Sequence, residues 1–176
     1  MDKQELRRLI RERKRRFTTQ ELQSMSSSVV RRLLAHPQVK AAGTVMCYYS
    51  LPDEVDTHGL VDELRRQGKR VLLPVVLADG QMELREYTGT ESMNEDQYHI
   101  LEPSGAPFTR LDDIDVALIP GMSFDDVGHR LGRGKGYYDR FLCRLPQLYK
   151  IGVCFDFQKM KKIPHDAHDV MMDEII

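Results

Sequence analysis

The sequence predicts one α/β domain in which a mostly parallel sheet is covered by helices. Two runs, 44–49 and 70–76, are almost continuously apolar, which is typical of strands buried on both faces of a parallel sheet. Between them a helical pattern at 57–67 ends at Gly68, and this strand–helix–strand order indicates a βαβ unit. With 176 residues, 41% of them hydrophobic, the chain can bury a sizeable core as a single domain over 1–176.

Two helices are expected before the first strand. Over residues 2–16, Leu6 and Ile10 fall on one face of a helix, and eight lysines and arginines occupy the rest of its surface. Thr18 and Glu21 then have the spacing of a capping box, which predicts the start of a second helix. The N-terminal part is therefore expected to be helical and strongly cationic.

The remaining elements follow from shorter patterns. Segment 88–112 is polar and rich in turn formers, and we expect a long surface segment there, which in a compact domain is more often functional than idle. The other expected elements are a more exposed strand at 82–87, a buried strand at 116–120, a helix at 136–144, and strands at 150–155 and 171–176.

Charge is distributed unevenly along the chain. Residues 1–40 hold 11 Lys/Arg against 4 Asp/Glu, a balance of +7, whereas the remainder holds 15 against 23, a balance of −8. Such a basic arm could contact nucleic acid, a phosphate-bearing ligand or the acidic remainder of the same chain. Its charged pattern is not that of a signal peptide, and no apolar run approaches the ~20 residues of a membrane helix. We therefore expect a cytoplasmic protein, with Cys47, Cys143 and Cys154 reduced.

Residues 128–140 carry the most informative motif. Gly132, Gly134 and Gly136 alternate with Arg133 and Lys135, directly before the expected helix. Glycines let backbone N–H groups approach an anion, and the cations and a helix N-terminus favour its charge, so the stretch suits a polyphosphate. The P-loop motif fails here, because its spacing would need glycine and Ser/Thr where His129 and Gly136 stand. The G-x-G-x-x-G dinucleotide fingerprint fails as well, since the spacing is G-x-G-x-G.

Together with its surroundings, this motif resembles a known family signature. Ile119–Asp125 followed by Arg130–Asp139 is similar to the signature of 5-formyltetrahydrofolate cyclo-ligases. The resemblance extends over nearly the whole chain, because four further segments match family elements: Lys3 with Arg7, Tyr49–Thr57, Ile100–Pro103 and Pro164–Asp173. It implies a three-layer α/β/α architecture with a mostly parallel central sheet, resembling the NagB/RpiA/CoA-transferase-like fold.

The resemblance also implies roles for individual residues. Arg133 and Lys135 are expected to be catalytic. The residues expected to bind ATP are Lys3, Arg7, Arg130, Leu131, Gly132, Arg133, Gly134, Lys135, Gly136, Tyr137 and Tyr138. Those expected to bind the folate are Tyr49, Glu54, Tyr98, Arg133 and Tyr137. Asp139 and Asp169 are expected to hold Mg²⁺, which on nucleotide phosphates usually takes one or two carboxylates.

The family reaction converts 5-formyltetrahydrofolate and ATP into 5,10-methenyltetrahydrofolate, ADP and phosphate through a phosphorylated formyl group, an iminium phosphate. The resemblance therefore implies an ATP-dependent ligase of folate one-carbon metabolism with two small-molecule substrates, acting as a monomer without nucleic acid or membrane. Two rival hypotheses are a nucleic-acid binder using the cationic first helix and a different ATP-dependent enzyme, such as a small-molecule kinase. His165 and His168 could suggest a transition-metal site, but a polar surface turn is favoured because further ligands are missing from the pattern.

Overall fold

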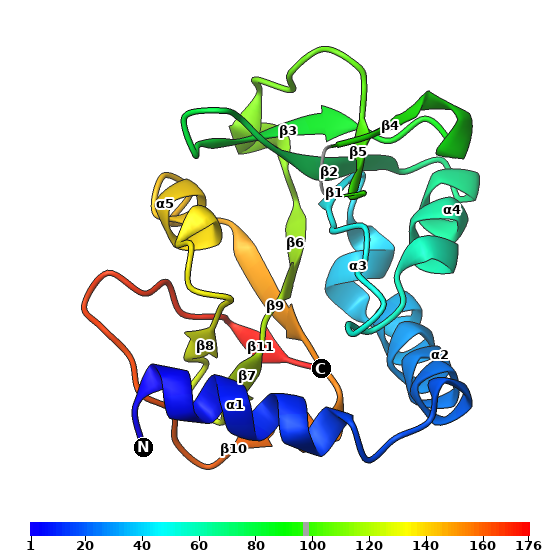
Figure 1. The fold of residues 1–176 in the computed structure, drawn as a ribbon. Coiled ribbons are helices and arrows are strands. Elements are labelled where there is room, and N and C mark those ends of the chain that lie inside the picture. Colours follow the sequence, from blue (N-terminus) through cyan, green and yellow to red (C-terminus); the bar gives the residue numbers. More distant parts are fainter. Residues whose placement is uncertain (97–98) are drawn as a thin grey trace.

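A six-stranded, mostly parallel sheet forms the centre of the molecule. The computed structural model describes residues 1–96 and 99–176. The strand order is β11-β9-β6-β1-β2-β3 (Figure 1), and all neighbours are parallel except β2 and β3, which form an antiparallel pair. The strands are β1 (Thr44–Met46), β2 (Arg70–Val76), β3 (Met82–Glu86), β6 (Val116–Pro120), β9 (Tyr149–Val153) and β11 (Glu174–Ile175). The predicted mostly parallel sheet is therefore confirmed.

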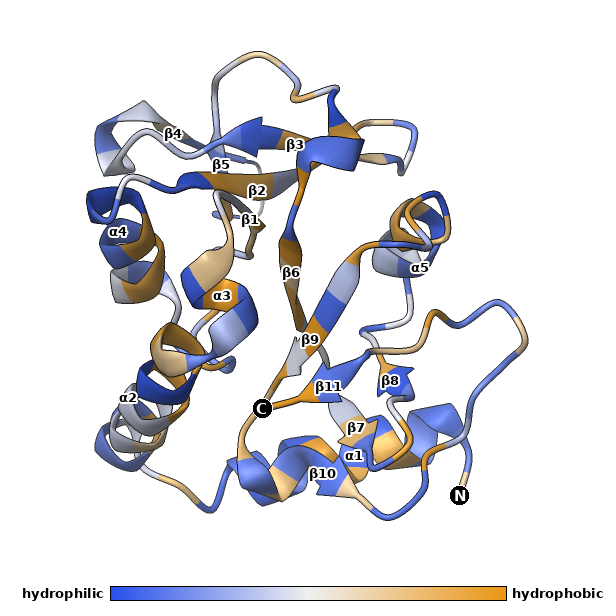
Figure 2. Cartoon of the chain, turned by 180° about the vertical axis from the view of Figure 1, so that it is seen from behind, coloured by the Kyte–Doolittle hydropathy of each residue, from blue (hydrophilic) through white to orange (hydrophobic). Residues whose placement is uncertain are grey.

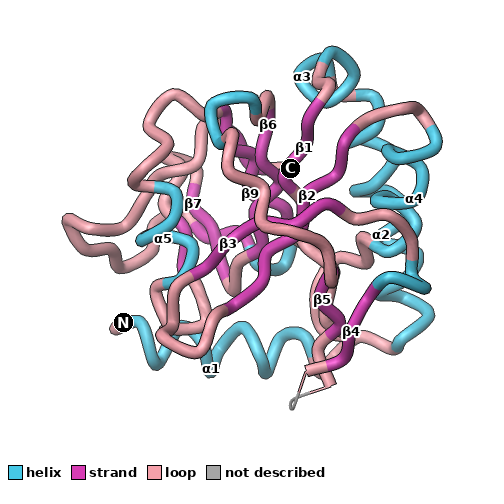
Figure 3. Tube along the Cα trace, turned by 90° about the horizontal axis from the view of Figure 1, so that it is seen from above, coloured by secondary structure: helices cyan, strands magenta, loops and turns pink. Residues whose placement is uncertain are grey.

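Helices cover both faces of this sheet. Helices α2 (Thr19–Ala35), α3 (Pro37–Ala41) and α4 (His58–Arg66) lie on one side, and the short α5 (Tyr137–Leu142) lies on the other (Figure 3). Successive strand residues alternate between the two apolar layers, so that Val45 packs with α2 and α4 whereas Met46 packs with α5. The result is the expected three-layer α/β/α arrangement.

Helix α1 (Lys3–Lys14) lies apart from these layers, against a second, small sheet. That sheet has the order β10-β7-β8 and consists of β7 (Ser123–Asp125), β8 (Arg130–Leu131) and β10 (Lys159–Met160). Leu6 and Ile10 are buried in a third apolar cluster beneath α1, although most of the helix is hydrophilic (Figure 2). These two residues hold a cationic helix against the segment that leads into the glycine-rich loop.

Several predicted boundaries differ from the structure. The first strand ends at Met46 rather than Tyr49, because Thr57 donates a hydrogen bond to the Tyr48 carbonyl and accepts one from the Ser50 amide, which draws the chain away from the sheet. The expected surface segment 88–112 contains a short antiparallel pair, β4 (Met93–Glu95) and β5 (Leu101–Pro103). The small sheet around β7 was not predicted. Among the described residues, no helix combines the length and the apolar character that crossing a bilayer requires.

Candidate active site

Apart from Lys3 and Arg7 of α1, the predicted site residues that the structure describes follow the carboxyl ends of three adjacent parallel strands, β1, β6 and β9. The loop after β1 carries Tyr49 and Glu54, the chain after β6 reaches the glycine-rich loop, and the chain after β9 leads to Asp169. From β1 the chain moves to β2 on one side, and from β6 it moves to β9 on the other, so the topological switch point lies between β1 and β6. In open α/β sheets this position is where ligands bind.

The glycine-rich loop connects β8 to α5 and needs glycine for its backbone conformation. Gly134 has φ 104° and Gly136 has φ 71°, values that L side chains rarely adopt. Lys135, between them, is exposed, and none of the described residues forms a hydrogen bond or ion pair with its ammonium group. The loop therefore presents an available cation on a backbone that only glycines can adopt without strain.

Two cations of α1 contact this region from the side. The Arg7 Nε donates a hydrogen bond of 2.9 Å to the Gly132 carbonyl, which attaches the loop to the helix. The Lys3 ammonium lies 2.7 Å from Asp169 and 2.6 Å from Asp166. Burial opposes ionisation of Asp169, but the hydrogen bonds from Lys3 and the Asp166 amide, together with the charges of Lys3 and Arg130, outweigh it, so the pKa of this carboxyl lies below its usual value. Both N-terminal residues expected at ATP thus lie beside the glycine loop and the predicted metal ligand.

Arg130 and Leu131 are beneath the loop rather than on it. The Arg130 side chain is 4% exposed, and its guanidinium donates to the Pro120 carbonyl at 3.0 Å and lies 5.2 Å from the centre of the Tyr138 ring. Its Nε is buried and has no hydrogen-bond partner among the described residues. The Leu131 side chain is buried in the cluster under α1, so only its backbone can serve a ligand. Both residues support the loop from below.

Asp139 and Asp169 approach each other through the backbone. The Asp139 Oδ1 accepts a hydrogen bond of 3.1 Å from the Val170 amide, and its Oδ2 lies 3.4 Å from Arg130. Because Val170 follows Asp169 directly, the two predicted metal ligands belong to one locality. Two carboxylates of this kind fit Mg²⁺, which keeps several waters and takes its other ligands from substrate phosphates. Among the described residues there is no group of three or more His, Cys, Asp or Glu placed to hold a metal ion.

The glycine loop and the loop after β1 meet directly. Arg133 Nη2 donates to Glu54 Oε1 at 3.1 Å and to Asp53 Oδ1 at 2.7 Å. The other Glu54 oxygen accepts the Leu51 amide at 2.9 Å. Burial raises the pKa of Glu54 above its usual value, despite the opposing effects of the Leu51 amide and Arg133. The structure therefore brings a predicted phosphate-binding cation and the predicted folate carboxylate into contact.

The tyrosines predicted to contact the ligands differ in burial and in their partners. Tyr49 stacks on His58, with ring centres 3.8 Å apart and an interplanar angle of 12°. Tyr137 is partly buried, with the Arg140 guanidinium 5.5 Å from its ring centre. Tyr138 packs inward, and burial raises the pKa of its phenol, so its predicted contact with ATP is restricted to its exposed part. Tyr98 lies outside the described residues.

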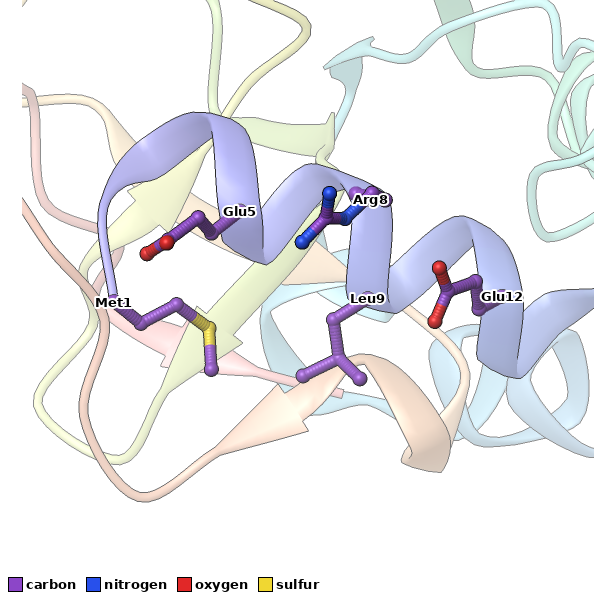
Figure 4. A pocket seen from close by; sticks show the side chains of 5 residues that line it. All are labelled: Met1, Glu5, Arg8, Leu9 and Glu12. Atoms are coloured by element: carbon purple, nitrogen blue, oxygen red, sulfur yellow. The ribbon is translucent and has the colours of Figure 1, made fainter.

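A hollow on the outer side of α1 lies away from these groups. It is lined by Met1, Glu5, Arg8, Leu9 and Glu12 (Figure 4). None of these side chains was predicted to bind a ligand, and the α1 residues that were, Lys3 and Arg7, contact the glycine loop and the Asp166–Asp169 turn instead. We therefore place the candidate site where the charges of three loops converge.

Sequence reasoning missed residues that the structure places at this site. Asp53 and Lys14 form an ion pair of 2.9 Å beside Arg133, and Asp166 shares Lys3 with Asp169. A signal for Lys14 was present, because positions 3, 7 and 14 fall within about 40° of one another on a helix of 3.6 residues per turn. Lys3, Arg7 and Lys14 therefore share one face of the helix, which separates them from the other five cations of this segment.

An α/β fold with a switch-point site of cations, carboxylates and a glycine-rich loop is the arrangement of an enzyme that acts on small anionic molecules. The sequence profile of the 5-formyltetrahydrofolate cyclo-ligase family matches residues 1–176. The chain therefore belongs to this family and is an enzyme.

Individual relatives agree with this assignment. The chain is 33% identical to the 5-formyltetrahydrofolate cyclo-ligase of Escherichia coli K12, with 96% of each chain covered, and 28% identical to that of Mus musculus, covering 99% of this chain and 92% of the relative. Among solved structures, the 5,10-methenyltetrahydrofolate synthetase of Aquifex aeolicus matches with a TM-score of 0.87 at 32% identity, covering 99% of this chain and 89% of that one. The synthetase of Mycoplasma pneumoniae matches with a TM-score of 0.78 at 29% identity, covering 100% and 98%.

Proposed function

We propose that this enzyme converts 5-formyltetrahydrofolate and ATP into 5,10-methenyltetrahydrofolate, ADP and phosphate, through a phosphorylated formyl group. The observation that carries the proposal is the contact of Arg133 with Glu54 at 3.1 Å. It joins the loop suited to phosphates to the loop expected to hold the folate, and phosphoryl transfer between two substrates needs such adjacency.

The chemistry explains why ATP is required. A formamide oxygen is a poor leaving group, so N10 of the folate cannot displace it at a useful rate. In the first step the formyl oxygen attacks the γ-phosphorus, the bond to the β–γ bridging oxygen breaks, and ADP leaves. The N5 lone pair stabilises the product as an iminium phosphate. N10 then attacks the activated carbon, phosphate departs with the former formyl oxygen, and N10 loses its proton.

Within this scheme the chain's residues mainly position substrates and spread charge. Lys135 and Arg133 stabilise the transferring phosphoryl group, because both present N–H donors from the glycine loop. Lys3 and Arg7 hold the remaining phosphates from α1. The ion pair of Lys3 with Asp169, a proposed Mg²⁺ ligand, supports this role, because the phosphates would bind the same Mg²⁺.

Mg²⁺ belongs to the same proposal. Asp139 and Asp169 would hold it, and when bound it supplies Lewis-acid stabilisation of phosphate oxygens. Asp139 also supports buried Arg130, so it keeps a structural role in addition to any metal ligation.

The folate half rests on Glu54 and Tyr49. The Glu54 carboxylate can accept hydrogen bonds from the amino and ring N–H groups of a pterin, and Tyr49 and Tyr137 offer ring contacts. Tyr98 remains a proposed contact without structural description. We further propose that the enzyme is a cytoplasmic monomer that needs no nucleic acid. Four cations of α1 contact acceptors of the chain itself, which supports the absence of a nucleic-acid partner: Lys3, Arg7, Arg13 and Lys14.

The test is the near-ultraviolet absorbance of the methenyl product. Purified protein is mixed with 5-formyltetrahydrofolate and Mg-ATP, and matched reactions omit ATP or the protein. The proposal expects an absorbance increase only in the complete mixture, with one ADP formed per methenyl group. ATP consumption without that absorbance would instead indicate a different ATP-dependent enzyme, such as a small-molecule kinase.

A further inference from the structure

Asp53 lies between two cations that come from different parts of the chain. Its Oδ1 accepts a hydrogen bond from Arg133 at 2.7 Å, and its Oδ2 accepts one from Lys14 at 2.9 Å. Lys14 is in the last turn of α1, and its side chain is only 11% exposed. Each carboxylate oxygen thus has one cationic partner, and the three side chains form a continuous line from α1 to the glycine-rich loop.

The geometry of Arg133 shows which part of its guanidinium is engaged. The same atom, Nη2, donates to both Asp53 and Glu54. Nη1 and Nε donate to none of the described residues. The guanidinium is therefore held at one corner, and its remaining N–H groups are available to a phosphoryl oxygen.

Asp53 and Glu54 both accept a hydrogen bond from Arg133, but they differ in whether they can keep it when the folate is bound. Under the proposed function the folate occupies Glu54, which is 14% exposed and also accepts the Leu51 amide. Asp53 has no such second partner among the residues that the structure describes, where Lys14 and Arg133 alone bond its carboxylate. Burial opposes ionisation of Asp53, but its bonds with Lys14 and Arg133 outweigh it and hold its pKa below the usual value. Asp53 is therefore anionic at neutral pH and can hold Arg133 without Glu54.

We infer that Asp53 is a positioning residue that, with Lys14 behind it, keeps Arg133 directed into the site after Glu54 has turned to the folate. This inference rests on the proposed function, because it assigns Asp53 a part in the same reaction. It concerns orientation and not fold stability, since Asp53 and Arg133 are 40% and 43% exposed and pairs of that exposure contribute little to folding.

The test compares Asp53→Asn with a matched control, Asp113→Asn. Asp113 also pairs with an arginine, Arg110 at 3.3 Å, and is 52% exposed, but neither residue belongs to the site. Asp53→Asn is expected to lower kcat about tenfold with little change in the KM for either substrate, because a misdirected group acts mainly on the transition state. Lys14→Gln should give a smaller loss of the same kind, and Asp53→Glu should recover part of it.

A double-mutant cycle with Arg133→Ala identifies the route of the effect. If Asp53 acts through Arg133, then Asp53→Asn has no further effect on kcat in the Arg133→Ala background. A tenfold loss that persists without Arg133, or a kcat for Asp53→Asn equal to that of the Asp113→Asn control, would overturn the inference. The unmodified enzyme distinguishes failure of the proposed function from failure of this inference. If it forms no methenyl-folate, the proposed function is wrong and the inference falls with it. If it does form methenyl-folate, the Asp53 variants test the inference alone.

Discussion

Replacing Asp125 by asparagine tests how the site is built on its scaffold. Asp125 is 2% exposed at the end of β7. Its Oδ1 accepts the amides of Val127 and His129, and its Oδ2 accepts the Ile163 amide at 3.1 Å and a His129 ring N–H at 3.0 Å. This carboxylate therefore ties the β7–β8 turn to the chain segment that carries Asp169.

The size of the effect follows from these bonds. An amide NH₂ in place of Oδ2 faces the Ile163 N–H and leaves that buried donor without an acceptor, at a cost of about 1–3 kcal/mol. The bonds to Oδ1 lose their ionic character, which removes about 1 kcal/mol more. Asp125→Asn should thus destabilise the fold by about 3 kcal/mol and lower Tm by roughly 6–12 °C for a chain of this size.

The dependence on pH provides a second readout. Burial opposes ionisation of Asp125, but the Ile163 amide and His129 outweigh it and hold its pKa below the ordinary aspartate value of 3.8. A lowered folded-state pKa means that this stabilisation is complete above about pH 3.8 and is lost as the pH falls through the lower, folded-state pKa. The difference in unfolding free energy between the unmodified protein and Asp125→Asn should therefore shrink at acid pH.

Urea unfolding of Asp125→Asn and of a neighbouring control, Asp126→Asn, measures both effects. Asp126 is exposed, and none of the described residues bonds its side chain, so its replacement should change stability by less than about 0.5 kcal/mol. If Asp125→Asn were as stable as the Asp126→Asn control at neutral pH, the claim that Asp125 joins these segments would be wrong.

Three further predictions concern the site. Lys135→Ala should lower kcat by about two orders of magnitude with Tm unchanged, because the exposed Lys135 ammonium forms no hydrogen bond or ion pair with the described residues. Asp139→Ala should lower kcat and in addition destabilise the fold by about 3 kcal/mol, because it leaves buried Arg130 without its carboxylate; kinetics and thermal unfolding of both variants check this. The KM for the folate should rise as the pH falls toward the Glu54 pKa, which burial raises above its usual value, because protonation removes the carboxylate that accepts the pterin N–H groups. Glu54→Gln should remove that pH dependence. A pH-independent KM in the unmodified enzyme would argue against Glu54 as the folate carboxylate. Lys3→Met should raise the KM for ATP about tenfold, since it removes a phosphate-binding cation, and an unchanged KM would exclude Lys3 from the nucleotide site.

The fold was largely predictable because its strands are buried on both faces. The limits of β2 and β6 agree with the predicted runs 70–76 and 116–120, as continuous apolar segments leave few alternatives. The small sheet was not predictable in the same way. Strands β8 and β10 have two residues each, too few for a periodic pattern, and their pairing with β7 is set by tertiary contacts.

The candidate site was predictable as a set of residues but not as a set of contacts. The motif resemblance named the glycine loop, Glu54 and Asp169, and the structure brings these segments near the switch point, while their roles stay predictions. Burial of Arg130 could not be read from the motif, because an arginine next to a glycine loop looks the same whether it faces a ligand or supports the loop. Asp53 was missed for a related reason, since its partner Lys14 is distant in sequence.

The fate of the formyl oxygen tests the central claim most directly. 5-Formyltetrahydrofolate labelled with ¹⁸O in the formyl group is converted in a single turnover with Mg-ATP, and the inorganic phosphate is analysed by mass spectrometry. Phosphorylation of that oxygen predicts one ¹⁸O atom in each phosphate released. Unlabelled phosphate, formed together with the methenyl product, would show that the formyl oxygen leaves by another route and would contradict the mechanism.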